Sequence, residues 1–302
     1  MKTLTNYITL LLICLAMGLG SACEIVDDEP KQKLENLFTS KAPQVQSYQL
    51  DAENGGQITT DHGVNIVVYP GAFTDVNGDR YEGPVKLEIK EVFTIPEMIF
   101  SGVLPVGYNR LGRSPYPIES DGQFFIRATQ AEGNGILNLY KNGIYAEVPR
   151  NSSNPNMRLY TSGQAIDADT IRWEIDTTNF ILPGDTFGND TIHRFNINKF
   201  NWINCDAPFL RDYTRVKVEL SYTGSKLDVM KAFLVFRQAN SVYHFSDHVF
   251  NTDQTLVIFG YRGEDLFYDI VDIAPPIDQV ISLDMKQTTR KELQELIEKL
   301  QE

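Results

Sequence analysis

Cysteine is scarce in this chain of 302 residues, which contains only Cys14, Cys23 and Cys205. The first two belong to an amino-terminal leader and to its processing site, as argued below, so Cys205 has no partner within its own chain. A disulfide framework is therefore excluded, and the fold has to be held together by its own hydrophobic core. The content of 42% hydrophobic and 11% aromatic residues is sufficient for such a core.

Positive charge is also in short supply. The 27 lysine and arginine residues stand against 40 aspartate and glutamate residues, which gives a net charge of −13. No run of lysine and arginine exceeds two adjacent residues. Because a polyanion requires a positive surface that displaces its counterions, nucleic acid is excluded as a partner.

Recognisable catalytic motifs are missing as well. The chain contains no GxSxG or HExxH sequence and no glycine-rich phosphate-binding loop, so no enzyme class is indicated and no cofactor is expected. Carboxylates are abundant, but the sequence does not show which of them share a cleft. A surface hydrolase with an unrecognised carboxylate site therefore stays open as the alternative to a non-enzymatic module.

The chain begins with one lysine and an apolar segment at residues 8–19. This segment is too short to span a bilayer as a permanent helix, and small residues follow it. The sequence GSAC at residues 20–23 resembles the lipobox cut by lipoprotein signal peptidase, although Leu19 stands four rather than three positions before Cys23. We predict a lipoprotein signal peptide over residues 1–22 and a lipid on Cys23. The alternative is an ordinary secretory signal, which leaves this cysteine as a free thiol.

Residues 23–46 are polar and carry an acidic cluster, EIVDDEP, at residues 24–30. Low hydrophobicity and high charge predict a flexible acidic tether over this range. The cluster resembles the export signal that sends lipoproteins of the Bacteroidota to the outer face of the outer membrane, and a merely soluble linker is the alternative. The expected location is the outer membrane, lipid-anchored and facing the cell exterior, with the periplasmic face as the alternative.

From residue 47 onward the pattern is that of β-strands. Apolar Val85, Leu87 and Ile89 alternate with charged residues, and an Asn-Gly pair at residues 142–143 favours a hairpin. Short strands separated by turn residues, with no helix between them, predict an all-β chain with two antiparallel β-sandwich domains in tandem.

The last stretch of the chain is helical by pattern. Thr289 and Glu292 form a capping box ahead of one apolar face, which predicts a short C-terminal α-helix that docks on the second sandwich; a coiled-coil dimer is the alternative. The expected order is signal peptide 1–22, tether 23–46, first β-sandwich 47–165, interdomain segment 166–192, second β-sandwich 193–285 and C-terminal helix 286–302.

Two groups of short motifs resemble a known family. The first comprises GGQI at residues 55–58, GV at 63–64, VYPGAF at 68–73 and GPV at 83–85, and the second is NWINCD at 201–206. They are similar to motifs of a family of Bacteroidota surface lipoproteins, in which glycine is usual in place of Asn201. The first group is remotely similar to the spectrin-binding β-sandwich of ankyrins and netrin receptors. The resemblance implies a tandem β-sandwich without established enzyme activity, and it supplies no substrate.

Two clusters contain residue types that bind metal ions. Asp75, Asn77 and Asp79 place oxygen atoms at alternate positions, as a calcium loop does, but the Gly and Glu required later in such a loop are missing. A hairpin turn is the favoured interpretation. His244 and His248 are four residues apart, but the segment is not helical by pattern, so exposed loop histidines are favoured over a metal site.

Trp202, Cys205 and Asp206 form the most distinctive cluster. A nucleophilic Cys205 requires a histidine base, and no histidine is near it in the sequence. We interpret the cluster as structural, with a buried aromatic ring and a small apolar thiol at a domain corner.

Asp-Thr pairs gather in the interdomain segment. Their sequences resemble the acceptor of Bacteroidota protein O-glycosylation, which makes Thr170, Thr177 and Thr191 candidates for modification. Polar turns favour both residue types in any case, which is the alternative explanation.

The tripeptide at residues 244–246, His-Phe-Ser, matches the sequence at which some eukaryotic adaptors with the spectrin-binding type of sandwich cleave themselves. In that reaction Ser246 attacks the Phe245 carbonyl and His244 takes the hydroxyl proton. An ordinary transition from strand to loop is the alternative.

Taken together, the patterns predict a lipid-anchored surface protein that acts as a non-enzymatic binding or structural module. Its expected partners are the outer membrane, through Cys23, and an unidentified protein or glycan. A cleft with two carboxylates about 5–10 Å apart favours the hydrolase alternative, whereas an aromatic-lined shallow face favours the binding module.

Overall fold

The computed structural model describes residues 29–108, 115–152, 154–168, 171–182, 191–209, 214–222, 224 and 226–302. The predicted signal peptide, the lipidation candidate Cys23 and the glycosylation candidate Thr170 lie outside the described residues. Strands account for 49% of the described residues and helices for 13%. The predicted all-β class, with antiparallel sheets and a short C-terminal helix, is confirmed.

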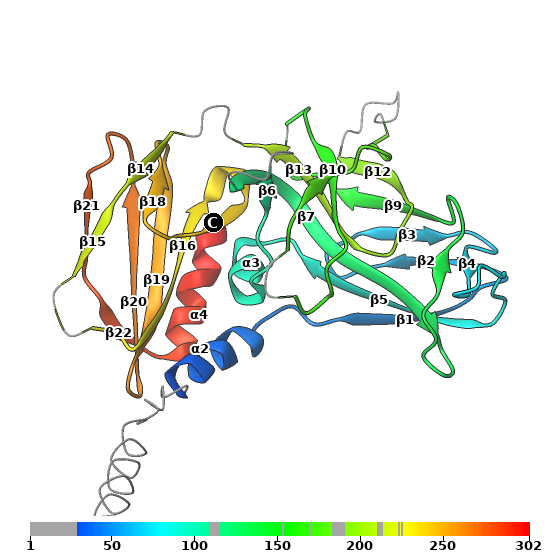
Figure 1. Cartoon of the computed structure of the whole chain (residues 1–302), viewed down its shortest axis with the longest axis horizontal. Coiled ribbons are helices and arrows are strands. Elements are labelled where there is room, and N and C mark those ends of the chain that lie inside the picture. The colour runs from blue at the N-terminus through cyan, green and yellow to red at the C-terminus, as the bar shows by residue number, and fades with distance from the viewer. Residues whose placement is uncertain are drawn as a thin grey trace, which may run out of the picture.

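The first β-unit, on the right of Figure 1, contains two facing sheets. Its strands are β1 (Gln46–Asp51), β2 (Gly56–Thr59), β3 (Asn65–Val68), β4 (Phe73–Thr74), β5 (Pro84–Val92), β6 (Val106–Tyr108), β7 (Pro115–Gln130), β8 (Asn138–Leu139), β9 (Ile144–Pro149), β10 (Arg158–Ser162), β11 (Glu174–Ile175), β12 (Ile192–Ile197) and β13 (Trp202–Pro208). A seven-stranded sheet runs β1-β5-β7-β13-β10-β11, with β6 paired to β7, and a four-stranded sheet runs β12-β9-β3-β2. The short strands β4 and β8 pair with each other.

The predicted alternation determines which side chains fill this unit. Val85, Leu87 and Ile89 of β5 are fully buried in a core that they share with residues such as Ile66 of β3 and Phe195 of β12. Successive residues of a strand point to opposite faces, so the charged residues between them lie on the other face of the seven-stranded sheet. Part of that outer face packs on the helices, because Phe125 of β7, the neighbour of Lys90 in the sheet, belongs to the core that the helices share.

The expected boundary of the second sandwich at residue 193 is wrong. β12 pairs with β9, and β13 lies between β7 and β10 in the middle of the seven-stranded sheet. Both strands therefore belong to the first β-unit. Residues 166–192 are also more than a bridge, because Trp173 is fully buried and β11 pairs with β10. The chain leaves the first unit only after residue 208.

The second β-unit, on the left of Figure 1, follows. Its elements are β14 (Arg215–Lys217), β15 (Glu219–Tyr222), β16 (Val229–Phe236), the short helix η1 (Arg237–Ala239), β17 (Ser241–His244), β18 (His248–Phe250), β19 (Gln254–Arg262), β20 (Asp265–Ile273), β21 (Val280–Leu283) and β22 (Lys286–Thr288). A five-stranded antiparallel sheet runs β17-β16-β19-β20-β22, while β14 pairs with β18 and β15 runs parallel to β21. One face of the five-stranded sheet packs on a core that includes Leu234, Phe236 and Leu256.

Three helices lie between the two β-units (Figure 1). They are α2 (Glu29–Thr39), α3 (Ile95–Ser101) and α4 (Arg290–Glu298), and the short helix η2 (Lys299–Gln301) continues α4. Their apolar residues join side chains of both units in one hydrophobic core, which contains Trp202 of the first unit and Phe259 of the second. The two β-units are therefore joined by a shared core rather than by a linker alone.

Helix α2 overturns the prediction of a flexible tether over residues 29–39. Leu34, Leu37 and Phe38 are buried, and their spacing places them on one face of a helix. The average hydrophobicity of this segment is low, but its few apolar residues are spaced so that a helix places them on the same face. The tether predicted for residues 23–46 is thus shortened by a docked helix.

The C-terminal helix agrees with its sequence pattern. Thr289 caps α4, its side chain accepting a hydrogen bond from the backbone N–H of Glu292, whose own side chain bonds back to the cap. Leu293 and Ile297 are fully buried in the shared core. The helix thereby reaches beyond the second unit, because the side chain of Gln301 accepts a hydrogen bond of 2.7 Å from the backbone N–H of Ile95 in α3. Within the described part of the chain, no helix combines the length and the apolar character needed to cross a bilayer.

Candidate functional site

The candidate site lies where strands of both β-units contact the helices α2 and α3. A cavity of about 580 Å³ opens between α2, α3, β5, β16, β17 and the segment 166–168. We call it the interface cavity. Each wall comes from a different part of the chain, so the cavity exists only when both units and α2 have assembled.

Aromatic rings form the apolar wall of the interface cavity. Phe38 of α2 lies 5.4 Å from Phe259 and 6.2 Å from Phe233, measured between ring centroids, and 6.4 Å from Phe100 of α3. Phe38, Phe100 and Phe233 line the cavity together with Ile99. The docking of α2 is therefore what shapes this wall.

One ion pair lies at the wall formed by α2 and β16. Lys231 Nζ is 3.2 Å from Glu35 Oε1 and 4.1 Å from the centroid of the Phe38 ring. The ammonium group thus has both a carboxylate partner and an aromatic face. The carboxylate of Glu35 is held by the same contact.

Lys90 is in a different situation. Its ammonium group forms no hydrogen bond or ion pair with the residues that the structure describes, and desolvation by burial lowers the pKa of Lys90, partly offset by the negative charge of Asp167. Lys86, two residues earlier on the same face of β5, is paired with Glu88 at 2.8 Å, and Arg127 contacts the same carboxylate at 2.7 Å. Of the two lysines on this face, only Lys90 enters the cavity wall.

His244, at the end of β17, also lines the interface cavity. Its ring stacks on Phe233 with 5.2 Å between centroids. The surrounding protein desolvates the imidazole and the charge of Lys231 repels a second cation, so the pKa of His244 is lowered. The ring therefore remains neutral at pH 7.

A second, smaller cavity of about 230 Å³ adjoins the first, sharing Gly102 and His244 with it. We call it the side pocket. Its lining is apolar and aromatic and includes Tyr108 and Tyr243. The guanidinium of Arg172 lies 5.6 Å from the centroid of the Tyr108 ring.

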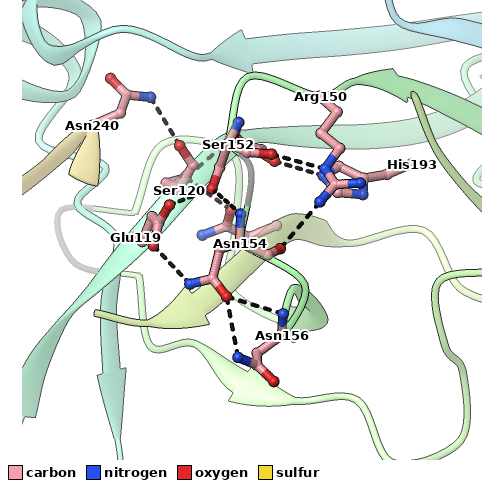
Figure 2. A network of polar contacts seen from close by, with 11 residues as sticks. Glu119, Ser120, Arg150, Ser152, Asn154, Asn156, His193 and Asn240 are labelled. Atoms are coloured by element: carbon pink, nitrogen blue, oxygen red, sulfur yellow. Dashed lines mark hydrogen bonds and ion pairs between the residues drawn. The ribbon is translucent and has the colours of Figure 1, made fainter. Parts of the chain in front are cut away.

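A polar network lies elsewhere, mostly within the first β-unit, and Asn240 of the second unit joins it by donating a hydrogen bond of 3.0 Å to the backbone carbonyl of Ser120 (Figure 2). Asp121 Oδ2 is 2.6 Å from His193 Nε2, and the exposed fractions of these side chains are 1% and 5%. Asp121 also accepts a hydrogen bond of 2.7 Å from the backbone N–H of Ser152, whose hydroxyl group donates to Glu119. The network fastens the loop after β9 to strand β7. Nothing in the sequence patterns had singled it out.

Comparison with known proteins gives no further guide. No family model, no curated protein and no solved structure matches this chain. The site has to be interpreted from its own chemistry.

The calcium candidates form a turn. Asp75 Oδ1 accepts hydrogen bonds of 2.9 Å from the backbone N–H groups of Asn77 and Asp79. These bonds, led by the one from Asp79, lower the pKa of Asp75. In the described part of the chain, no group of three or more His, Cys, Asp or Glu side chains is arranged to hold a metal ion.

Trp202, Cys205 and Asp206 are all fully buried. Trp202 packs edge-to-face on Trp173 at 6.2 Å and donates a hydrogen bond of 3.1 Å to the backbone carbonyl of Ala165. Burial raises the pKa of the Cys205 thiol, which is the opposite of what a nucleophile requires. Burial and the nearby charges of other carboxylates also raise the pKa of Asp206. These properties fit the structural interpretation.

The self-cleavage candidates are not aligned for the reaction. The Ser246 hydroxyl donates to Asp247 Oδ1 at 3.3 Å, and no hydrogen bond joins it to His244 within the described residues. His248 also bonds to Asp247, at 2.5 Å, so the two histidines do not converge on one site. The glycosylation candidates Thr177 and Thr191 are both exposed, as a modified residue must be.

Apart from His244, which the sequence suggested for other reasons, sequence reasoning missed the residues that line the interface cavity. A usable signal for α2 was present in the spacing of Leu34, Leu37 and Phe38. For Lys90 there was none, because the sequence shows that Lys86, Glu88 and Lys90 share one face of a strand but not which lysine lacks a partner.

Proposed function

We propose that this chain is a lipid-anchored protein of the outer membrane, exposed at the cell surface, that binds a ligand in the interface cavity without enzymatic turnover. The single observation that carries the binding function is the cavity itself, which is lined by aromatic rings and by Lys90, a cation without an ion-pair partner among the described residues. Cavities with mostly apolar walls and a few polar groups are the usual form of a ligand site.

The proposed location rests on the sequence alone, and the position of α2 shows what it would mean for the cavity. Glu29, the first residue of α2, follows Cys23 by six positions. Six extended residues span about 20 Å at most. With a lipid on Cys23, the interface cavity would be held near the membrane surface, where one of its walls is the first helix of the folded body.

Binding is tested by comparing a variant whose cavity is filled by a large side chain with a variant whose cavity is unaltered. Ala168 lines the interface cavity, and Ala168→Trp would occupy its volume. Ala131, which lies in the turn after β7, supplies the control Ala131→Trp. The non-lipidated mature chain, carrying Cys23→Ala, is screened by thermal shift against a defined panel of amino acids, sugar acids, short oligosaccharides and aromatic acids.

We expect compounds that stabilise the parent chain to lose their effect in Ala168→Trp and to keep it in Ala131→Trp. A panel without any stabilising compound contradicts the proposal, as does binding that survives Ala168→Trp unchanged.

A hydrolase is the second candidate, because Glu35 and Asp167 both line the interface cavity. Glycoside hydrolysis uses two such carboxylates. The ion pair of Glu35 with Lys231 makes binding the better supported function, since that carboxylate is already engaged. Turnover of chromogenic glycosides that disappears in both Glu35→Gln and Asp167→Asn would reverse this order.

A further inference from the structure

The charges around the interface cavity do not balance. Lys31, Lys90 and Lys231 carry three positive charges, and Glu35 and Asp167 carry two negative ones. The excess of one positive charge (3 − 2) occurs in a chain whose net charge is −13. His244 adds nothing near neutral pH because its pKa is lowered. These six residues are the titratable groups of the cavity wall.

The excess positive charge is concentrated at two lysines rather than spread over the cavity wall. Lys231 and Glu35 neutralise each other at 3.2 Å. Lys90 and Lys31 remain, facing the single carboxylate of Asp167, and neither lysine forms a hydrogen bond or ion pair with a described residue. Lys31 is exposed on α2, whereas Lys90 is partly buried on β5. Lys90 is therefore the cation that gains most from an anionic partner, because burial has already removed much of its water.

The remaining residues of the cavity wall indicate which kind of chemical group carries the anion. Phe38, Phe100 and Phe233 offer aromatic surface beside the lysines. The side pocket continues the apolar surface past Gly102 towards Tyr108 and Tyr243. A small inorganic anion would leave this surface exposed to water, whereas a ring or chain attached to the anion would cover it.

We propose that the interface cavity binds a monoanionic amphiphile, whose single carboxylate-type charge pairs with Lys90 and whose apolar body packs against Phe38 and Phe233. This inference rests on the proposed binding function and names the ligand class for it. Asp167 disfavours a second negative charge on the ligand. The side pocket, which shares Gly102 and His244 with the interface cavity, offers further apolar surface to a longer body.

The test uses two probes that differ only in charge. 2-Naphthoate carries a carboxylate on an aromatic body, and 2-naphthamide has the same rings without the charge. Binding to the non-lipidated mature chain is measured by isothermal titration calorimetry. We expect 2-naphthoate to bind at least about tenfold more tightly, as a charge-assisted hydrogen bond requires. 2-Naphthyl phosphate, tested alongside, should bind less tightly than the carboxylate.

Variants assign the charge to Lys90. Lys90→Met should reduce the affinity for 2-naphthoate about tenfold and leave the affinity for 2-naphthamide unchanged. Lys141 is exposed in a turn, and the control variant Lys141→Met should alter neither affinity. As pH rises through the lowered pKa of Lys90 the affinity for 2-naphthoate should fall, and Lys90→Arg should preserve it because arginine stays charged.

Each outcome is decisive. Equal affinities for the two naphthalene probes, unaffected by Lys90→Met, would overturn the anion preference while leaving a ligand-binding cavity. No binding of either probe would overturn the inference as well, and the panel with Ala168→Trp would then judge the proposed function separately. If 2-naphthyl phosphate binds more tightly than 2-naphthoate, the proposed preference for a ligand with a single negative charge is wrong.

Discussion

The ring of Phe38, near the amino terminus, lies 5.4 Å from the ring of Phe259, a residue of the second β-unit. Between these two residues the chain builds the whole first β-unit. The contact therefore ties α2 to a partner that is distant in sequence, and it positions a wall of the interface cavity at the same time.

Phe38→Ala should lower the free energy of unfolding by about 3–5 kcal/mol, because it removes a buried aromatic side chain and leaves a cavity. Chemical denaturation measures the effect. Phe180, whose side chain is 66% exposed, supplies the control, and Phe180→Ala should change stability by no more than about 0.5 kcal/mol. Similar small effects at both positions would show that α2 is not docked in solution.

Lys90→Met should raise the free energy of unfolding at pH 7, by on the order of 0.5–1 kcal/mol for a partly exposed group. The pKa of Lys90 is lowered by burial, so the folded chain binds fewer protons than the unfolded chain above that pKa. The stability of the parent chain therefore rises as pH increases from the folded pKa towards 10.5, and the advantage of Lys90→Met shrinks. Thermal unfolding between pH 7 and pH 10.5 checks this sign, and an advantage that grows with pH would contradict it.

His62 should make stability depend on pH in the opposite direction. Its Nε2 atom is 2.8 Å from Glu97 Oε1, and this hydrogen bond raises the pKa of His62. The contribution is present in full below the unfolded pKa of about 6.5 and is lost as pH rises through the raised folded value. His62→Gln should cost roughly 0.5–1 kcal/mol at pH 6 and less at pH 8. The His62 ring also stacks on Phe93 with 4.9 Å between centroids. A cost independent of pH would mean that this packing, and not charge, is what His62 contributes.

Cys23→Ala should abolish fatty-acid labelling and release the chain from the membrane fraction. The prediction follows from the GSAC sequence at residues 20–23 and is checked by metabolic labelling of cells that express the gene. Retained label in the variant would refute the lipid assignment. Protease treatment of intact cells then separates a surface location, in which the protein is digested, from a periplasmic one.

Thr177, one of the glycosylation candidates, is exposed in the segment that follows β11. The intact mass of the protein from its native host should exceed that of lipid plus polypeptide. Thr177→Val should then remove one glycan mass. The neighbouring Thr178 offers the control, because its hydroxyl donates to Asp176 at 2.7 Å, and Thr178→Val should leave the mass excess in place.

The fold was predictable where a local sequence pattern determines which face of a strand or helix is buried, or where a helix begins. The alternation of Val85, Leu87 and Ile89 and the capping box at Thr289 both describe local geometry, and both are seen. The assignment of β12 and β13 to the first unit was not predictable, since strand pairing depends on contacts between distant segments. The cavity depends on the same long-range contacts, and so the role of Lys90 had no local signal.

The position of α2 has a consequence for how the protein is made. Phe38 is synthesised 195 residues before Phe233 (233 − 38), an interval of roughly 10–40 s at about 5–20 residues per second. During that time the apolar face of the helix lacks its partners in the second β-unit, Phe233 and Phe259. The apolar face of α2, although synthesised early, therefore completes its packing only after the second β-unit has been made, and until then it has to be kept from aggregating.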